Sequence, residues 1–183
     1  MSPHDPPSPW REFLQELDSF LDDRFDFHCI GGFALVIAYG LRRSTNDLDY
    51  VSLIPCNRIP DVQSIAGPGS RLAKKHKVNV QHVGVATVPE NYQERLRELY
   101  PGYFKHIHLY VLDPYDLVLS KLSRNADRDR EDAKHLIETQ KLDPEILWER
   151  YQKELRAFLV GPPEQHDKTL EFWIEAYFPL TKD

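Results

Sequence analysis

A pair of glycines and a later pair of aspartates are the residues of this sequence best placed to do chemistry. Gly31 and Gly32 end an apolar stretch, and a helical pattern follows them at once. Glycines at such a turn let a phosphate group approach the backbone, and the helix N-terminus behind them offers N–H groups and a favourable dipole. This order predicts a phosphate-binding turn, although a glycine pair after a strand is also common in ordinary tight turns.

Asp47 and Asp49 alternate with apolar residues in the segment DLDYVSLI. A strand points every second side chain to the same face, so the two carboxylates share one face while Leu48 points to the core. Neighbouring carboxylates repel each other unless a cation lies between them, and Mg²⁺ is held by one or two carboxylates together with substrate phosphates. The pair predicts a Mg²⁺ or Mn²⁺ site, with a solvated strand edge as the alternative.

The elements that position these residues follow from hydrophobic spacing and from turn residues. Apolar residues at alternating or β-branched positions predict strands over 25–30, 47–54, 78–88 and 106–112. Helical spacing predicts helices over 9–22, 33–39, 60–66, 69–76 and 91–99. The fold class is therefore α/β (α+β), with a small mixed sheet flanked by helices.

The chain after residue 112 is expected to be almost wholly helical, over 114–123, 128–139, 143–159 and 165–177. Asp113 and Asp143 each precede a proline, which is a helix start with an N-cap and Pro at the first position. We expect a disordered lead-in over 1–8 and a single domain over 9–183. That domain comprises an α/β core over 9–112 and a helical section over 113–183.

The composition of the chain limits the binding partners and the cellular compartment that we expect for the protein. The formal net charge is −6, so any nucleic acid would need a local basic patch such as Arg71, Lys74, Lys75, His76 and Lys77, for which a solvated helix end is the favoured interpretation. Cys29 and Cys56 form no disulfide framework or zinc pattern. No apolar run is long enough to span a bilayer and no signal pattern opens the chain, so a cytoplasmic protein without membrane contact is expected.

The order Gly-Gly, helix, Asp-x-Asp resembles the nucleotidyltransferase superfamily, and in detail the branch that holds the AbiEii-type toxins of type IV toxin–antitoxin systems and related domains. The run RSTNDLD from Arg43 to Asp49 is similar to the Arg-x-Thr-x-Asp-x-Asp stretch of that branch. DLVLSK, ending at Lys121, and the Arg-Asp-x-x-Asp run Arg128 to Asp132 are similar to two further signatures. The resemblance spans roughly residues 26–138 and implies the nucleotidyltransferase fold.

The resemblance also implies roles for individual residues. Gly31 and Gly32 would shape the triphosphate turn, while Asp47 and Asp49 would hold the metal and carry catalysis. Lys121 would face the phosphates as a third catalytic residue that also binds the nucleotide, and Arg43, Thr45 and Arg124 would join it at the nucleotide. Asp129 and Asp132 would support Lys121 or Arg124, or would act as residues at the start of a helix. Lys121 borders the apolar stripe of its helix, so shortening it should cost little stability.

One difference from the superfamily leaves open whether the protein is catalytically active. Active members of the superfamily usually carry a third carboxylate on a later strand, whereas the segment from Val78 to Ala86 carries Gln81 and His82. His82 is the available proton acceptor there, with a structural histidine as the alternative. We therefore expect Mg²⁺- or Mn²⁺-dependent transfer of a nucleoside monophosphate from an NTP to a tRNA or protein hydroxyl, in a protein with a cognate toxin or antitoxin partner. The alternative is a non-catalytic nucleotide-binding or antitoxin-like protein of the same fold.

Overall fold

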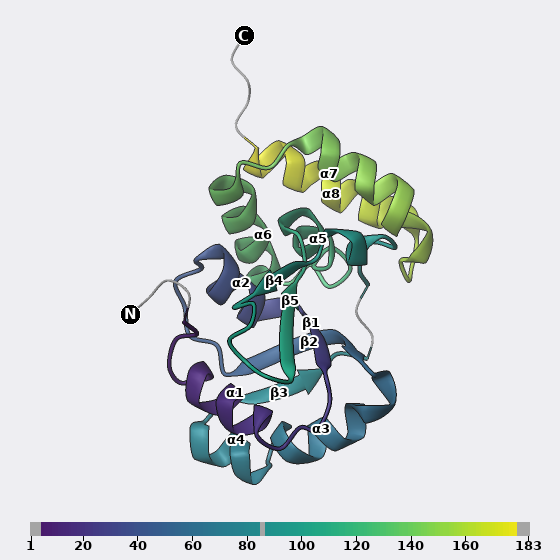
Figure 1. The fold of residues 1–183 in the computed structure, drawn as a ribbon. Coiled ribbons are helices and arrows are strands. Elements are labelled where there is room, and N and C mark those ends of the chain that lie inside the picture. The colour runs from purple at the N-terminus through teal and green to yellow at the C-terminus, as the bar shows by residue number, and fades with distance from the viewer. Residues whose placement is uncertain (1–4, 85–86, 179–183) are drawn as a thin grey trace. The chain divides into compact units, whose positions relative to one another are not determined.

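The computed structural model describes residues 5–84 and 87–178. Contacts along the chain divide it into two compact units. The first unit comprises Met1–Val85 and Leu96–Val111, and the second comprises Ala86–Arg95 and Leu112–Asp183 (Figure 1). The expected lead-in lies partly outside the described residues, and of its described part Pro7 accepts a hydrogen bond from the backbone N–H of Arg11 at 3.0 Å.

The first unit contains a mixed five-stranded sheet in the order β3-β2-β1-β5-β4. Its strands are β1 (Phe25–Cys29), β2 (Asp47–Ile54), β3 (Asn79–His82), β4 (Arg97–Leu99) and β5 (Ile107–Val111). β1 runs antiparallel to β2 and parallel to β5, β2 runs parallel to β3, and β4 runs antiparallel to β5. β1 is the central strand, and both faces of the sheet are covered there, because Phe27, His28 and Cys29 are all buried.

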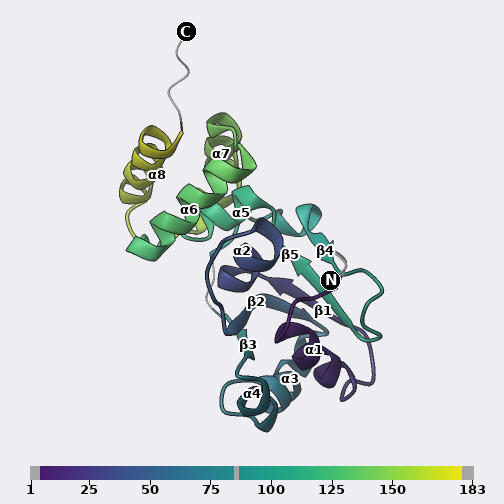
Figure 2. The same ribbon diagram turned by 90° about the vertical axis from the view of Figure 1, so that its left-hand side faces the viewer.

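Four helices flank this sheet: α1 (Trp10–Asp18), α2 (Gly31–Tyr39), α3 (Ile59–Ala66) and α4 (Arg71–His76). A 3₁₀ turn, Cys56–Arg58, precedes α3. α1, α3 and α4 lie together on one side of the sheet, and α2 lies on the other (Figures 1 and 2). Leu48 and Tyr50 face the three-helix side, where the Tyr50 hydroxyl accepts a hydrogen bond from Gln63 at 2.8 Å. The opposite face of β2 is thereby left to Asp47 and Asp49.

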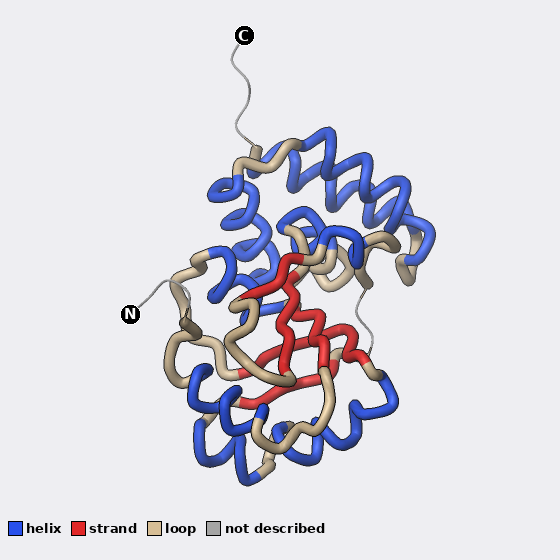
Figure 3. The backbone as a smooth tube through the Cα atoms, viewed as in Figure 1, coloured by secondary structure: helices blue, strands red, loops and turns tan. Residues whose placement is uncertain are grey.

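The second unit is helical, as expected (Figure 3). Its helices are α5 (Pro114–Leu119), α6 (Asp127–Gln140), α7 (Pro144–Arg150) and α8 (Pro163–Tyr177). The Asp113 and Asp143 carboxylates accept hydrogen bonds from Tyr115 N and Glu145 N at 2.9 and 2.8 Å, which confirms both predicted N-caps. Among the described residues, no helix is long and apolar enough to cross a membrane.

Ion pairs of Arg95 hold the segment before β4 against the rest of the second unit. Arg95 donates to both oxygens of the fully buried Asp116 at 3.0 Å and to Glu154 at 2.7 Å. Backbone bonding reinforces this attachment, because Glu90 N donates to Glu154 O at 2.9 Å. The segment's side chains and backbone are thus held by contacts far along the chain.

The sequence-based prediction of a helix over 91–99 is wrong. The structure has a 3₁₀ turn, Tyr92–Arg95, and then β4, whose residues pair with β5 from Arg97↔Val111 to Leu99↔Leu109. Hydrogen bonds to the following strand, β5, satisfy this backbone, and the helical propensity of residues 91–99 does not include the effect of such a partner. The helix expected over 143–159 is also interrupted, because a π-helical turn, Tyr151–Leu155, and a 3₁₀ turn, Arg156–Phe158, follow α7.

Candidate functional site

The two glycines form the junction between β1 and α2. Ile30 is extended, with φ of −131°, and its N–H donates to the carbonyl of Asp49 at 2.9 Å. Gly31 then takes φ of +64°, a left-handed conformation that favours glycine. α2 begins at Gly31 rather than at residue 33, so the glycine pair is itself the first turn of the helix.

The turn at Gly31 lies directly against β2. A Cβ built on Gly31 would collide with the Asp49 carboxylate, and one on Gly32 would lie 3.0 Å from Thr45 Oγ1 and 3.6 Å from an Arg43 guanidinium nitrogen. The β1–β2 register shifts between His28 and Cys29, next to this place. The structure therefore brings together five of the predicted site residues, Gly31, Gly32, Arg43, Thr45 and Asp49.

Asp47 joins them on the same face of β2. It is exposed and Asp49 is half-buried, whereas Leu48 and Tyr50 between and after them are buried. Asn79 Nδ2 donates to Asp47 Oδ1 at 2.8 Å, and the Asp47 carbonyl accepts from Thr45 Oγ1 at 3.2 Å. The predicted shared face of the two carboxylates is confirmed.

Cys29, at the end of β1, lies close enough to Asp49 to be affected by its negative charge. Burial raises the pKa of its thiol well above the ordinary value, and the negative charge of Asp49 raises it further. The thiol is fully buried and belongs to the packing, as expected from its apolar neighbours.

His82 does not lie on the carboxylate face. Within the parallel pair β2–β3 it is in register with Tyr50, and the two rings have centroids 5.3 Å apart. Since side chains alternate along a strand, His82 points away from Asp47 and Asp49, and the idea that it accepts a proton there is wrong. Asn79 and Gln81 are instead in register with Asp47 and Asp49. Sequence reasoning missed both amides as site residues, although their alternation in NVQH was visible.

Lys121 lies in the second unit, in the turn after α5, and is more deeply buried than expected. Its side chain is 7% exposed, and Nζ donates to Asp132 Oδ2 at 2.8 Å and lies 3.9 Å from Asp129. Lys121 does not lie at an exposed border, and its removal would take an ammonium group from the buried Asp132, so the structure predicts a larger loss of stability on shortening it than the sequence did. The predicted support of Lys121 by these two aspartates is confirmed.

Arg124 shares the same cluster. Nε and Nη2 donate to the two oxygens of the fully buried Asp129 at 2.7 and 2.5 Å, yet the Arg124 side chain is 71% exposed. Burial alone would raise the pKa of Asp129, but hydrogen bonds from Arg124 and Ala126 N hold it below its usual value. Asp129 is thus a carboxylate that fixes one end of an exposed guanidinium.

The donor set fits a divalent cation that shares its ligands with a substrate. Among residues 5–84 and 87–178, no three His, Cys, Asp or Glu side chains group together in a way that could hold a metal. Two carboxylates on one strand face, beside a turn that can take phosphates, are oxygen donors of the kind that Mg²⁺ and Mn²⁺ prefer. Asp47 and Asp49 would be its protein ligands, with phosphate oxygens completing the shell.

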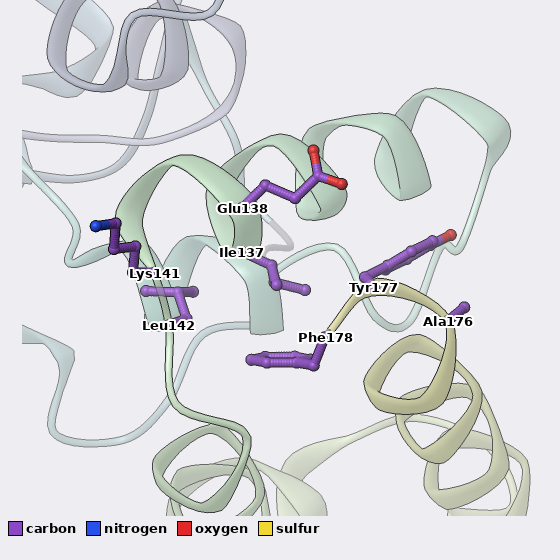
Figure 4. Close-up of a pocket in the computed structure, with 7 residues that line it drawn as sticks. All are labelled: Ile137, Glu138, Lys141, Leu142, Ala176, Tyr177 and Phe178. Atoms are coloured by element: carbon purple, nitrogen blue, oxygen red, sulfur yellow. The ribbon is translucent and has the colours of Figure 1, made fainter. Parts of the chain in front are cut away.

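Two other surface features are separate from these residues. On α4, Lys75 and His76 both contact Glu16 of α1, at 2.5 and 2.8 Å, which favours the solvated helix end over a nucleic-acid patch. A 670 Å³ pocket in the second unit is lined by the ends of α6 and α8, including Ile137, Leu142 and Phe178 (Figure 4). None of the predicted site residues lines it.

Comparison with known families gives one match. Residues 11–180 match the family DUF6036, described as a nucleotidyltransferase of unknown function. No curated protein matches the chain, and no solved structure does. The match covers the glycine turn, both aspartates and most of the helical unit, and the mixed sheet flanked by helices agrees with it. This protein therefore belongs to the nucleotidyltransferase family DUF6036.

Proposed function

We propose that the protein binds an NTP together with Mg²⁺ or Mn²⁺ at Gly31, Gly32, Asp47 and Asp49, and transfers the nucleoside monophosphate to a hydroxyl of an RNA or protein. The observation that carries the proposal is the contact between the Gly31 turn and the Asp49 carboxylate. It puts a turn suited to phosphates beside an acid suited to their cation.

The start of α2 is the phosphate-binding part of the proposed site. The first N–H groups of a helix have no partner within it, and the helix dipole adds positive potential there. The missing side chain of Gly31 leaves room for the Asp49 carboxylate, and neither glycine has a side chain of its own to cover these N–H groups. Thr45 and Arg43, close to the position of a Cβ on Gly32, would add a hydroxyl and a guanidinium to the same anion.

The reaction would join the acceptor oxygen to the α-phosphorus while the bond to pyrophosphate breaks, and the hydroxyl proton would pass to solvent water. A bound Mg²⁺ would supply neutralisation of the phosphate charge. Asp47 and Asp49 would hold it on the β2 face, while the glycine turn would align the triphosphate. Positioning and charge neutralisation are the contributions we assign to the protein.

Lys121 and Arg124 stay predictions as nucleotide contacts. The buried pairing of Lys121 with Asp132 favours a structural role for that lysine. Arg124 is better suited than Lys121 to bind a phosphate, because its exposed guanidinium is already held in place by Asp129.

A second proposal is a non-catalytic nucleotide-binding or antitoxin-like protein of the same fold. The orientation of His82 supports it, because the proton acceptor that the sequence offered points to the other face of the sheet. The AbiEii-type resemblance supports, for either proposal, a role in a toxin–antitoxin pair and the cytoplasm as compartment. Only the enzyme needs an acceptor, for which the resemblance suggests a tRNA or a protein side chain.

Labelling distinguishes the two proposals. The protein is incubated with each of the four α-³²P-labelled NTPs, Mg²⁺ and either total bacterial RNA or a protein lysate. Transfer to an acceptor in wild type, and its loss in Asp49→Asn, would support the enzyme. If no NTP labels an acceptor but calorimetry shows Mg²⁺-dependent NTP binding, the non-catalytic protein is the right proposal. Binding that is equal with Mg²⁺ and with EDTA would contradict the metal site.

A further inference from the structure

The strand beside the two aspartates carries amides in place of acids. In the parallel β2–β3 pair, Asp47 is in register with Asn79 and Asp49 with Gln81. Side chains in register on neighbouring strands point to the same face of the sheet. The face that would hold the cation therefore consists of two carboxylates flanked by two carboxamides.

A carboxamide has the shape of a carboxylate but carries no charge. Gln81 is exposed, so its amide borders the site without being part of the core. Asn79 contributes a donor, and its Nδ2 already occupies one oxygen of Asp47. A cation at this face would meet two negative charges, and Asn79 already donates to one oxygen of Asp47.

Two negative charges alone bind Mg²⁺ weakly, because this ion loses its coordinated water only at a high cost in free energy. Mg²⁺ keeps several waters when one or two carboxylates bind it, and substrate phosphates supply the missing charge. A third carboxylate at residue 81 would add an attraction at close range to any divalent cation, with or without a nucleotide.

We infer that Gln81 makes metal binding depend on the nucleotide: the juxtaposition of Gln81 with Asp49 keeps the two-aspartate site weak for a free divalent cation, which enters with the NTP. The inference rests on the proposed function. Gln81 would determine whether the cation binds before the NTP or together with it, and it would take no part in making or breaking a bond.

Mn²⁺ titration followed by the electron paramagnetic resonance signal of the free ion tests it. The proteins are wild type, Gln81→Glu and the control Gln165→Glu, which adds the same charge at an exposed position on α8. Each is titrated alone and with a non-hydrolysable NTP analogue. Gln81→Glu replaces an exposed side chain with one of the same shape, so folding should be unaffected.

Wild type and Gln165→Glu should bind Mn²⁺ weakly alone and markedly more tightly with the analogue. Gln81→Glu should bind Mn²⁺ alone about tenfold more tightly or better, with a smaller gain from the analogue. Tight Mn²⁺ binding by wild type without nucleotide would overturn the inference but leave the proposed metal site in place. The same conclusion would follow if Gln81→Glu bound Mn²⁺ no more tightly than the control Gln165→Glu. Failure of wild type to bind Mn²⁺ even with the analogue would overturn the proposed metal site and this inference with it.

Discussion

Gly31 and Asp49 lie so close together that residue 31 has no room for a side chain. Gly31 has φ of +64°, and the Asp49 carboxylate occupies the position of the missing Cβ. The backbone carbonyl of Asp49 also accepts a hydrogen bond from the N–H of Ile30. Asp49 therefore contacts the turn through both its backbone and its side chain. Glycine is thus required here both by backbone conformation and by the neighbouring carboxylate.

Gly31→Ala should therefore destabilise the protein more than an alanine at a glycine with a similar backbone conformation. Gly40, with φ of +70°, is the matched control, because no described atom lies within 4 Å of its Cβ position. Gly40→Ala should cost about 1 kcal/mol for the left-handed backbone alone. Gly31→Ala should cost about 2 to 4 kcal/mol, since it adds overpacking against Asp49.

Urea unfolding measures both values, and the double variant Gly31→Ala/Asp49→Ala separates the causes. Removing the carboxylate should recover part of the loss in Gly31→Ala. Equal losses in Gly31→Ala and Gly40→Ala would show that Asp49 does not restrict residue 31.

Asp49→Asn and Asp47→Asn should each remove the metal dependence of NTP binding and leave the fold intact. Both residues share one exposed or half-exposed strand face, so an isosteric amide opens no cavity. Calorimetric titration of an NTP with Mg²⁺ and with EDTA checks this. Asp61→Asn, at an exposed site on α3, is the control and should bind as wild type does.

Lys121→Met should cost about 3 kcal/mol of unfolding free energy, because it removes the ammonium group that pairs with the buried Asp132 carboxylate at 2.8 Å. The double variant Lys121→Met/Asp132→Leu should recover most of this loss, since no buried charge then remains unpaired at that position. Lys134→Met is the control: its pair with Glu138, at 3.8 Å, is half exposed and should contribute under about 0.5 kcal/mol. Thermal or urea unfolding of the four proteins gives the result, and a loss in Lys121→Met as small as that in Lys134→Met would show that the buried pair with Asp132 contributes little to stability.

The ion pair between Arg156 and Asp167 should make stability depend on acid pH. Hydrogen bonds from Arg156 and then from Tyr151 lower the pKa of Asp167 to about 2. A carboxyl with a depressed folded-state pKa contributes stability above its unfolded pKa of about 3.9, and the contribution disappears as the pH falls toward 2. Arg156→Gln should therefore be less stable than wild type at pH 7, with a difference that shrinks between pH 4 and pH 2.

Urea unfolding at pH 7, 4 and 2.5 compares Arg156→Gln with Lys168→Gln, which changes an exposed lysine of the same helical unit. Lys168→Gln should follow wild type at all three values. A difference between Arg156→Gln and wild type that stays constant across this range would show that the pair does not set the pKa of Asp167.

The local pattern of residues determined the elements that carry the site. β2 occupies 47–54 as predicted, because alternation between polar and apolar residues is a property of the strand itself. Gly40 ends α2 in a left-handed conformation, and the Asp-Pro pairs start α5 and α7, since capping involves only neighbours in the chain.

Only the tertiary structure decided which of these residues meet. Arg97 to Leu99 became a strand because β5 offered a partner, and His82 turned from the site because its register with Tyr50 set its face. The resemblance implied that Asp129 and Asp132 support Lys121, but the spacing of α5 placed this lysine at the border of an apolar stripe, and only the packing of α6 shows that its side chain is buried. Pairing and burial of this kind depend on hydrogen bonds and charges from distant segments, whereas a periodic pattern describes one segment at a time.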